Sequence, residues 1–201
     1  MAGERKAAKQ RTRRALIDAA VELFSEAGLD GPSLDAICER AGYTRGAFYV
    51  HFADRDALIV AVMEEAGPPI LDELIAADPD EDLATLFTRF LAAFADGSYP
   101  LAPRGGIKPH QLIDACVRSP KVGQRYVELV VEAMTRVARG VGRGQRENLV
   151  RDDVDPDAIA ALLVGAIIGS QTMSELGVPY DFSATAAAVL KLLMPVPVAS
   201  T

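Results

Sequence analysis

The segment SLDAICERAGYTRGAFYVHFADRDAL, from Ser33 to Leu58, is the part of the sequence that is most informative about the fold. Ser33 is a favourable N-cap for a short helix that Gly42 would end. Thr44 can cap a second short helix, which carries two phenylalanines on one side. Two short helices joined by a turn that contains glycine are typical of a helix-turn-helix unit, here over residues 33–52.

Helical periodicity extends to both sides of this unit. The preceding helix has apolar residues spaced three and four apart, and Gly28 supplies a left-handed stop. Asp54 caps a fourth helix, which we expect to end or kink at Gly67-Pro68-Pro69. Further helical patterns cover about 83–95, 110–117, 120–144, 156–176 and 183–194. Since no segment shows sustained alternation of apolar and polar residues, the sequence predicts an all-α protein of about nine helices.

The charge of the chain is divided unevenly. The net charge is −7, yet the first fifteen residues hold six basic residues and one acidic residue, a local charge of +5, which leaves −12 on the remainder. Attraction to phosphate is local, because salt screens it beyond about 8 Å. A basic arm on an acidic body can therefore bind nucleic acid. A solvated, disordered arm explains the same charge equally well.

The third helix carries hydrogen-bond donors on its polar surface. Thr44, Arg45, Tyr49 and His51 all suit phosphates or base edges. Gly46 costs about 1 kcal/mol relative to alanine inside a helix, less in its first turn, and leaves a smooth spot for close approach to DNA. Arg45 is the best candidate for a bidentate contact to guanine, and a contact to phosphate alone is the alternative.

The stretch from Ser33 to Leu58 resembles the signature of the TetR (tetracycline-repressor) family. The matching positions are Ala41-Gly42, Thr44, Gly46, Phe48-Tyr49, His51-Phe52 and Leu58, and the preceding helix matches at Ala19-Ala20, Leu23-Phe24 and Gly28. The resemblance implies an all-α fold with an N-terminal helix-turn-helix DNA-binding domain and a C-terminal helical domain for ligand binding and dimerisation. The expected segments are a basic flexible arm (1–9), the DNA-binding domain (10–54), the C-terminal domain (55–195) and a tail (196–201).

The same resemblance assigns roles to individual residues. Arg45, Gly46 and Ala47 lie where family members approach base edges, and Ser33, Thr44, Tyr49 and His51 lie where they contact phosphates. Arg55 keeps the positive charge that the family has just after its third helix. Arg11, Arg13 and Arg14 are candidates for the adjacent minor groove or its phosphates. The implied function is that of a cytoplasmic repressor, which a small, partly hydrophobic effector releases from double-stranded operator DNA.

A homodimer and a ligand pocket are expected in the C-terminal part. Small residues at Ala161, Gly165 and Gly169, with Leu190 on the last helix, suit close packing between helices of two subunits, although packing within one subunit is the alternative. The candidate pocket residues are Phe87, Phe90, Leu91, Phe94, His110, Leu112, Cys116, Tyr126, Val130 and Met134. An aromatic stripe of this kind is also common in a plain helical core.

Other function classes find little support in the sequence. It has no glycine-rich phosphate loop, nucleophile motif or cluster of histidine and cysteine, so we expect no enzyme activity, cofactor or metal site. We also expect no secretory signal and no membrane span, because no apolar run reaches the required length. The remaining alternative is a helical-bundle protein-interaction module, which would show no salt-sensitive DNA binding.

Overall fold

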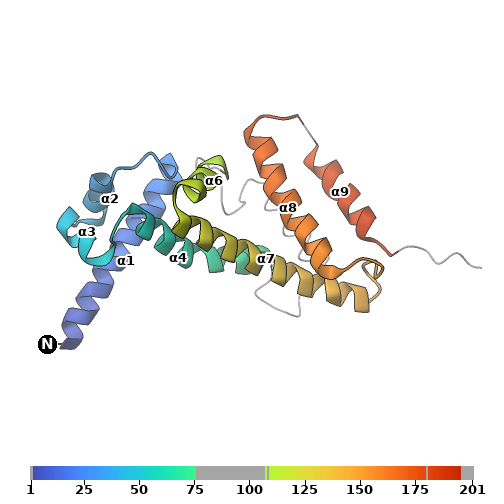
Figure 1. Cartoon of the computed structure of the whole chain (residues 1–201), viewed down its shortest axis with the longest axis horizontal. Coiled ribbons are helices and arrows are strands. Elements are labelled where there is room, and N and C mark those ends of the chain that lie inside the picture. The colour runs from blue at the N-terminus through green and yellow to red at the C-terminus, as the bar shows by residue number, and fades with distance from the viewer. Residues whose placement is uncertain (1, 76–106, 108, 180, 196–201) are drawn as a thin grey trace, which may run out of the picture. The chain divides into compact units, whose positions relative to one another are not determined.

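The computed structural model describes residues 2–75, 107, 109–179 and 181–195, and over this part of the chain it contains helices and no strand (Figure 1). The helices are α1 (Ala2–Ala27), α2 (Leu34–Ala41), α3 (Arg45–His51), α4 (Arg55–Ile75), α6 (Pro109–Arg118), α7 (Pro120–Arg146), α8 (Pro156–Glu175) and α9 (Phe182–Leu193). The all-α prediction is confirmed. The helix expected at about 83–95 lies outside the described residues.

The predicted caps set the ends of the short helices. The Ser33 and Thr44 hydroxyls each accept a hydrogen bond from the backbone amide three residues later, at 3.1 and 3.3 Å. The Asp54 carboxylate accepts one from the third residue after it, at 2.7 Å. Gly28 and Gly42 both have a φ of +74°, the left-handed conformation in which glycine is favoured. These local hydrogen bonds and turns place α3 after a sharp turn from α2.

Two elements differ from the expectation. The segment 1–9 is not a flexible arm, since α1 begins at Ala2 and the segment's alanine, lysine and arginine residues favour helix. Of the two outcomes expected at Gly67-Pro68-Pro69, an end or a kink of the helix, an end does not occur, because α4 continues through both prolines to Ile75. Beyond the prolines Leu71 is buried, and this packing offsets the backbone hydrogen bonds that proline removes.

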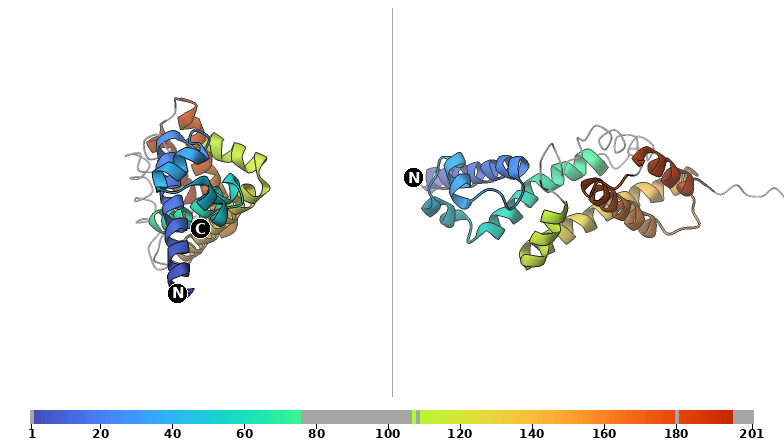
Figure 2. Two further views of the ribbon diagram at one scale, coloured as in Figure 1. Left: turned by 90° about the vertical axis from the view of Figure 1, so that its left-hand side faces the viewer. Right: turned by 90° about the horizontal axis from the view of Figure 1, so that it is seen from above.

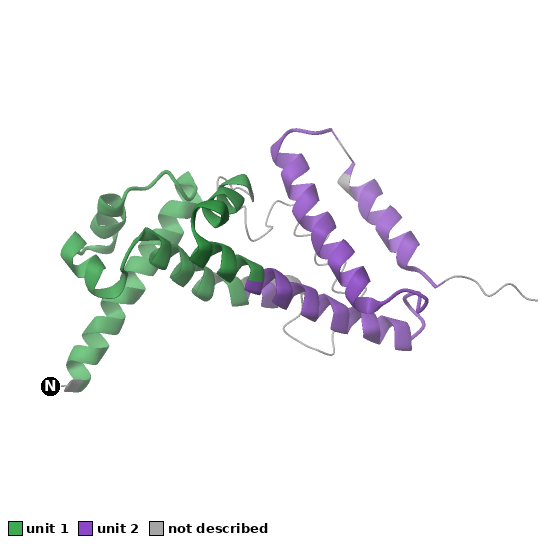
Figure 3. Ribbon diagram, in the orientation of Figure 1, with its two compact units in different colours: residues 1–68, 97–127 green, residues 69–96, 128–201 purple. Residues whose placement is uncertain are grey.

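The chain forms two compact units (Figure 3). Unit 1 comprises residues 1–68 and 97–127, and unit 2 comprises residues 69–96 and 128–201. We expected a boundary near residue 54 or within the fourth helix, and the division after residue 68 falls within α4. Helices α4 and α7 each begin in unit 1 and end in unit 2, so at these two crossings the chain passes between the units within a helix.

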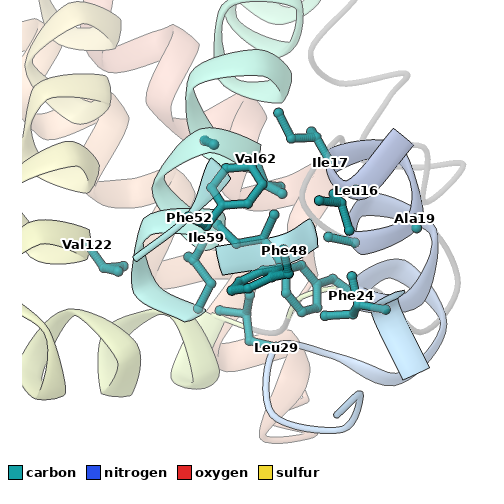
Figure 4. Close-up of a cluster of buried hydrophobic side chains, with 14 of the residues drawn as sticks. Leu16, Ile17, Ala19, Phe24, Leu29, Phe48, Phe52, Ile59, Val62 and Val122 are labelled. Carbon is teal, nitrogen blue, oxygen red and sulfur yellow. The ribbon is translucent and has the colours of Figure 1, made fainter. Parts of the chain in front are cut away.

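The core of unit 1 is built from side chains of six helices, α1 to α4, α6 and the start of α7. Its largest fully buried side chains are Leu16, Ile17, Phe24, Leu29, Ile37, Phe48, Leu58 and Val122. Figure 4 shows part of this cluster, and Figure 2 gives two further views of the ribbon. Leu112 from α6 and Val122 from α7 belong to this same cluster. Cys38 is buried in it and Cys116 packs against it, as small core residues would. The helix-turn-helix is therefore held by α6 and the start of α7 as well as by α1 and α4.

Unit 2 has a separate core. Val137 and Val141 of α7 pack with Ile159 and Ala160 of α8. The Gln145 amide donates hydrogen bonds to two backbone oxygens in the loop that precedes α8, at 3.0 and 2.8 Å. The loop between the two longest helices of this unit is thereby fixed.

Candidate DNA interface

Helix α3 is anchored by one face and exposed on the other. Phe48 is fully buried, and its ring centroid lies 5.4 Å from that of Phe52. On the opposite side Tyr49 is 51% exposed and Val50 is 63% exposed. Arg45 is exposed as well. Arg45 and Tyr49, which the sequence assigned to DNA, are thus presented by a helix whose position the core fixes.

Gly46 leaves an open surface on this exposed face. A Cβ atom added there would meet only the Thr44 hydroxyl oxygen, at 3.7 Å. The helix could therefore hold a larger residue without a clash in the free protein. What glycine provides at this position is a surface without a side chain, over which another molecule can come close to the helix backbone.

Arg45 takes part in a small polar cluster. Its Nη1 donates to the Asp35 carboxylate of α2 at 3.4 Å, and its Nη2 donates to the Tyr49 hydroxyl at 3.4 Å. The hydrogen bond with Tyr49 and the nearby charge of Asp35 raise the pKa of Arg45. The guanidinium is therefore fully charged and already oriented on the surface of the helix-turn-helix.

Basic residues of α1 lie near the end of α3. The Arg13 guanidinium stands 5.6 Å from the centroid of the Phe52 ring, and 3.9 Å from the Glu64 carboxylate of α4. Burial lowers the pKa of His51, and the positive charges of Lys9 and Arg13 lower it further.

The other two arginines of α1 that the sequence singled out differ from each other. Arg14 is paired with Asp18 at 2.9 Å and with Glu65 of α4. Arg11 is exposed. Arg11 is therefore a charge on the surface of α1, whereas Arg14 forms ion pairs with two carboxylates.

Arg55 does not take the position that the sequence suggested. Its guanidinium donates to the backbone oxygens of Leu29 and Pro32, the second at 2.7 Å, and lies 5.4 Å from the centroid of the Phe24 ring. Burial lowers the pKa of Arg55. The side chain is thus turned into unit 1, where it binds the turn between α1 and α2 to the start of α4.

Two further ion pairs hold α6 and α7 to this part of unit 1. Arg118, the last residue of α6, pairs with Asp30 at 2.8 Å. Lys121, at the start of α7, pairs with Asp54 at 3.1 Å. Sequence reasoning missed both pairs, because partners 67 and 88 residues apart leave no local pattern.

The candidate pocket residues divide between the two units. Leu112, Cys116 and Tyr126 contribute to the core of unit 1, and His110 is exposed. Val130 and Met134 pack against the core of unit 2. The remaining candidates, Phe87, Phe90, Leu91 and Phe94, lie outside the described residues. The pocket stays a prediction.

The candidate dimer residues lie on the outer surface of unit 2. Ala161 and Gly165 are exposed, Gly169 is half-buried, and a Cβ atom at either glycine would meet nothing within 4 Å. Leu190 of α9 is exposed too. By length and composition alone α8 would pass as a membrane-spanning helix, which is weak evidence of a span.

No group of three or more His, Cys, Asp or Glu side chains that could hold a metal ion occurs within the described ranges.

Comparison with known sequences identifies the N-terminal part. The sequence model of "Bacterial regulatory proteins, tetR family" matches residues 16–62. The uncharacterized HTH-type transcriptional regulator YvdT of Bacillus subtilis is 38% identical over 72 residues, 35% of this chain and 37% of YvdT. The HTH-type transcriptional repressor Rv1474c of Mycobacterium tuberculosis is 29% identical over 151 residues, 75% of each protein. The matches cover only 30% to 55% of the first three curated relatives.

Comparison with solved structures extends the likeness in fold to most of the chain. The reduced form of Escherichia coli NemR has a TM-score of 0.72 at 18% identity, covering 92% of this chain and 98% of NemR. A complex of SmeT with triclosan has a TM-score of 0.60 at 24% identity, covering 82% of this chain and 80% of SmeT. Residues 16–62 therefore match the N-terminal domain of the tetR family of bacterial regulatory proteins, and most of the chain shares its fold with these solved structures.

Proposed function

We propose that this protein is a sequence-specific DNA-binding transcriptional regulator of the cytoplasm, which represses as a homodimer and is released from its operator by a small effector. The observation that carries the proposal is the two-sided character of α3. Phe48 fixes one face of the helix in the core, and the other face exposes Arg45, Tyr49 and open backbone at Gly46. A short helix so presented fits the major groove.

The proposed contacts fall into two classes. Arg45 reads a base edge, for which its planar guanidinium suits the two acceptors of guanine, while Gly46 and Ala47 allow the helix to come close. Ser33, Thr44, Tyr49 and His51 contact phosphates and fix the register of the protein on the duplex. Arg55 is left out of the proposed contacts, because its donors are bonded to backbone oxygens inside unit 1.

The basic start of α1 adds attraction to phosphate. It carries exposed lysine and arginine side chains, and the Arg13 guanidinium lies over the Phe52 ring at the end of α3. Because α1 begins at Ala2, we propose that these residues meet the DNA backbone from a helix rather than from a flexible arm. Arg14 and Arg13 would first exchange their carboxylate partners for phosphate, so Arg11 is the preferred contact of the three arginines.

The exposed face of α8 supports the proposal of a dimer. No charged residue occurs between Asp157 and Glu175. Leu162 is 71% exposed and follows Ala161, with Gly165 three residues further on, and Leu176 at the end of α8 is 74% exposed. An exposed apolar helix face without charge marks an interaction surface. A second copy of α8 and α9 would bury it, and the same pairing would give two copies of α3 for two half-sites of DNA.

Release by an effector rests on family resemblance and on contacts within unit 1. Arg118 of α6 and Lys121 of α7 are ion-paired to Asp30 and Asp54, which flank the helix-turn-helix. A ligand that favours a different position of α6 would bias the turns at Asp30 and Asp54, and so the position of α3. The solved SmeT–triclosan complex is an example of a similar fold with a small, partly hydrophobic ligand.

A fluorescence titration with the protein's own upstream promoter DNA, at two salt concentrations, tests the proposed function. We expect tight binding that weakens steeply with salt, because bound phosphates release their counterions. Promoter DNA that binds no better than unrelated duplex at both salt concentrations would contradict it. That result would favour the alternative of a helical-bundle interaction module.

A further inference from the structure

A carboxylate stands beside the proposed base-reading arginine. Asp35 lies in the first turn of α2, and its Oδ2 accepts a hydrogen bond from Arg45 Nη1 at 3.4 Å. The second terminal nitrogen of Arg45 donates to the Tyr49 hydroxyl at 3.4 Å. Both ion-pair partners are open to solvent, with 68% of the Asp35 side chain and 54% of the Arg45 side chain exposed. The cluster therefore belongs to the surface that faces DNA in the proposed function.

An acidic group on this surface weakens attraction to DNA. A negative charge near the phosphates opposes binding to every sequence alike. An acidic residue in the first turn of a helix has an ordinary structural reason, because it complements the helix dipole. That reason does not explain why the carboxylate of α2 is bonded to the arginine at the start of α3.

We propose that Asp35 is a positioning residue for Arg45, which increases the discrimination between DNA sequences and decreases the affinity for all of them. The inference rests on the proposed function, in which Arg45 contacts a base. Arginine has five N–H donors, and Asp35 and Tyr49 use two of them. Three donors remain for DNA, on a guanidinium that is held in place from both sides.

Holding the guanidinium changes which sequences Arg45 can bind. A free arginine is long and flexible, and it reaches phosphates on any duplex. When Asp35 and Tyr49 hold it, its remaining donors are satisfied only where a base presents acceptors at the matching place. Asp35 also opposes the nearest phosphates by its charge, so binding without a base contact is disfavoured. Specificity then arises from the loss of non-specific binding.

The experiment compares the full-length protein with two neutral variants, Asp35→Asn and Glu39→Gln. Glu39 is exposed one turn further along α2, so its substitution removes the same charge from the same helix. Each protein is first allowed to select duplexes from a random DNA pool. Fluorescence anisotropy then measures its affinity for the selected sequence, for single-base-pair variants of that sequence and for a random duplex.

We expect Asp35→Asn to bind the random duplex more tightly and to lose preference at one base pair of each half-site. A good arginine–guanine pair discriminates by about 5- to 150-fold. The substitution should reduce this ratio by about threefold or more, as the arginine gains freedom. Glu39→Gln should keep the discrimination of the unaltered protein. Asp35→Glu, which keeps a carboxylate within reach, should keep most of it.

Thermal unfolding of the same variants separates positioning from a merely structural role. A residue that only stabilises α2 would lower the unfolding temperature of Asp35→Asn and leave its base preference intact. Unchanged preference in Asp35→Asn, or an equal loss of preference in Glu39→Gln, would overturn the positioning role and leave the regulator function in place. If the unaltered protein selects no sequence from the pool, both the inference and the proposed function are overturned.

Discussion

Replacement of Arg55 tests whether this residue stabilises unit 1 or contacts DNA. Its guanidinium donates to the backbone oxygens of Leu29 and Pro32 and lies 5.4 Å from the centroid of the Phe24 ring. Hydrogen bonds from charged groups contribute about 1.5–3 kcal/mol each, and a cation–π contact about 0.5–2 kcal/mol. Lysine keeps the charge but cannot serve two carbonyls with the same planar fork. Arg55→Lys should therefore lower the free energy of unfolding by about 2–4 kcal/mol.

Urea unfolding monitored by circular dichroism measures this loss. It is a large part of the free energy of unfolding of a typical protein, about 5–15 kcal/mol. A second variant, Arg55→Gln, removes the charge. It should leave the slope of log affinity against log salt unchanged, because no phosphate contact is lost. The matched control is Arg11→Gln, which should keep the stability and lower the slope by about 0.9 for each lost contact. If Arg55→Lys keeps its stability and Arg55→Gln has a smaller slope of log affinity against log salt, Arg55 contacts DNA rather than stabilising unit 1.

Three further predictions concern other parts of the molecule. Gly42→Ala should destabilise the protein by about 1–2 kcal/mol in thermal unfolding, because φ is +74° at this position. A Cβ atom there would meet nothing within 4 Å, so the loss comes from the backbone conformation alone. An unchanged melting temperature would contradict this. The pKa of His51 is lowered in the folded chain, so the unfolded chain binds the proton more readily, and stability should fall as pH drops below about 6.5. This loss of stability at low pH should be smaller in His51→Gln than in the unaltered protein. Equal losses in the two proteins would show that His51 does not cause it. Leu162→Glu should give a monomer in size-exclusion chromatography with light scattering, whereas Leu149→Glu, at another exposed leucine, should leave a dimer.

Local signals in the sequence predicted the helix-turn-helix well. Ser33 and Thr44 cap their helices through amides only three residues away, so the relevant partners stand together in the sequence. The spacing of Phe48 within its helix likewise predicted a buried face, and Phe48 is fully buried. Capping and periodicity are properties of a few adjacent residues, and for this reason they can be read without the fold.

Relations between distant residues could not be predicted in this way. The carbonyl partners of Arg55 precede it by 23 and 26 residues, and Arg118 is 88 residues away from Asp30. The family resemblance suggested a DNA contact for Arg55, but tertiary packing gives its guanidinium backbone acceptors inside unit 1. The prolines of α4 are a similar case, since the burial of Leu71 outweighs a local rule that ends helices.

In the proposed function, α3 reads DNA sequence through Arg45. Titration of Arg45→Ala against the operator and its single-base-pair variants tests it most directly. We expect the affinity of Arg45→Ala for the operator to fall. Operator variants at one base pair of each half-site already bind the unaltered protein weakly, so the substitution should change their affinity little. A uniform loss of affinity across all sequences would mean that Arg45 contacts only phosphate, and would contradict the claim.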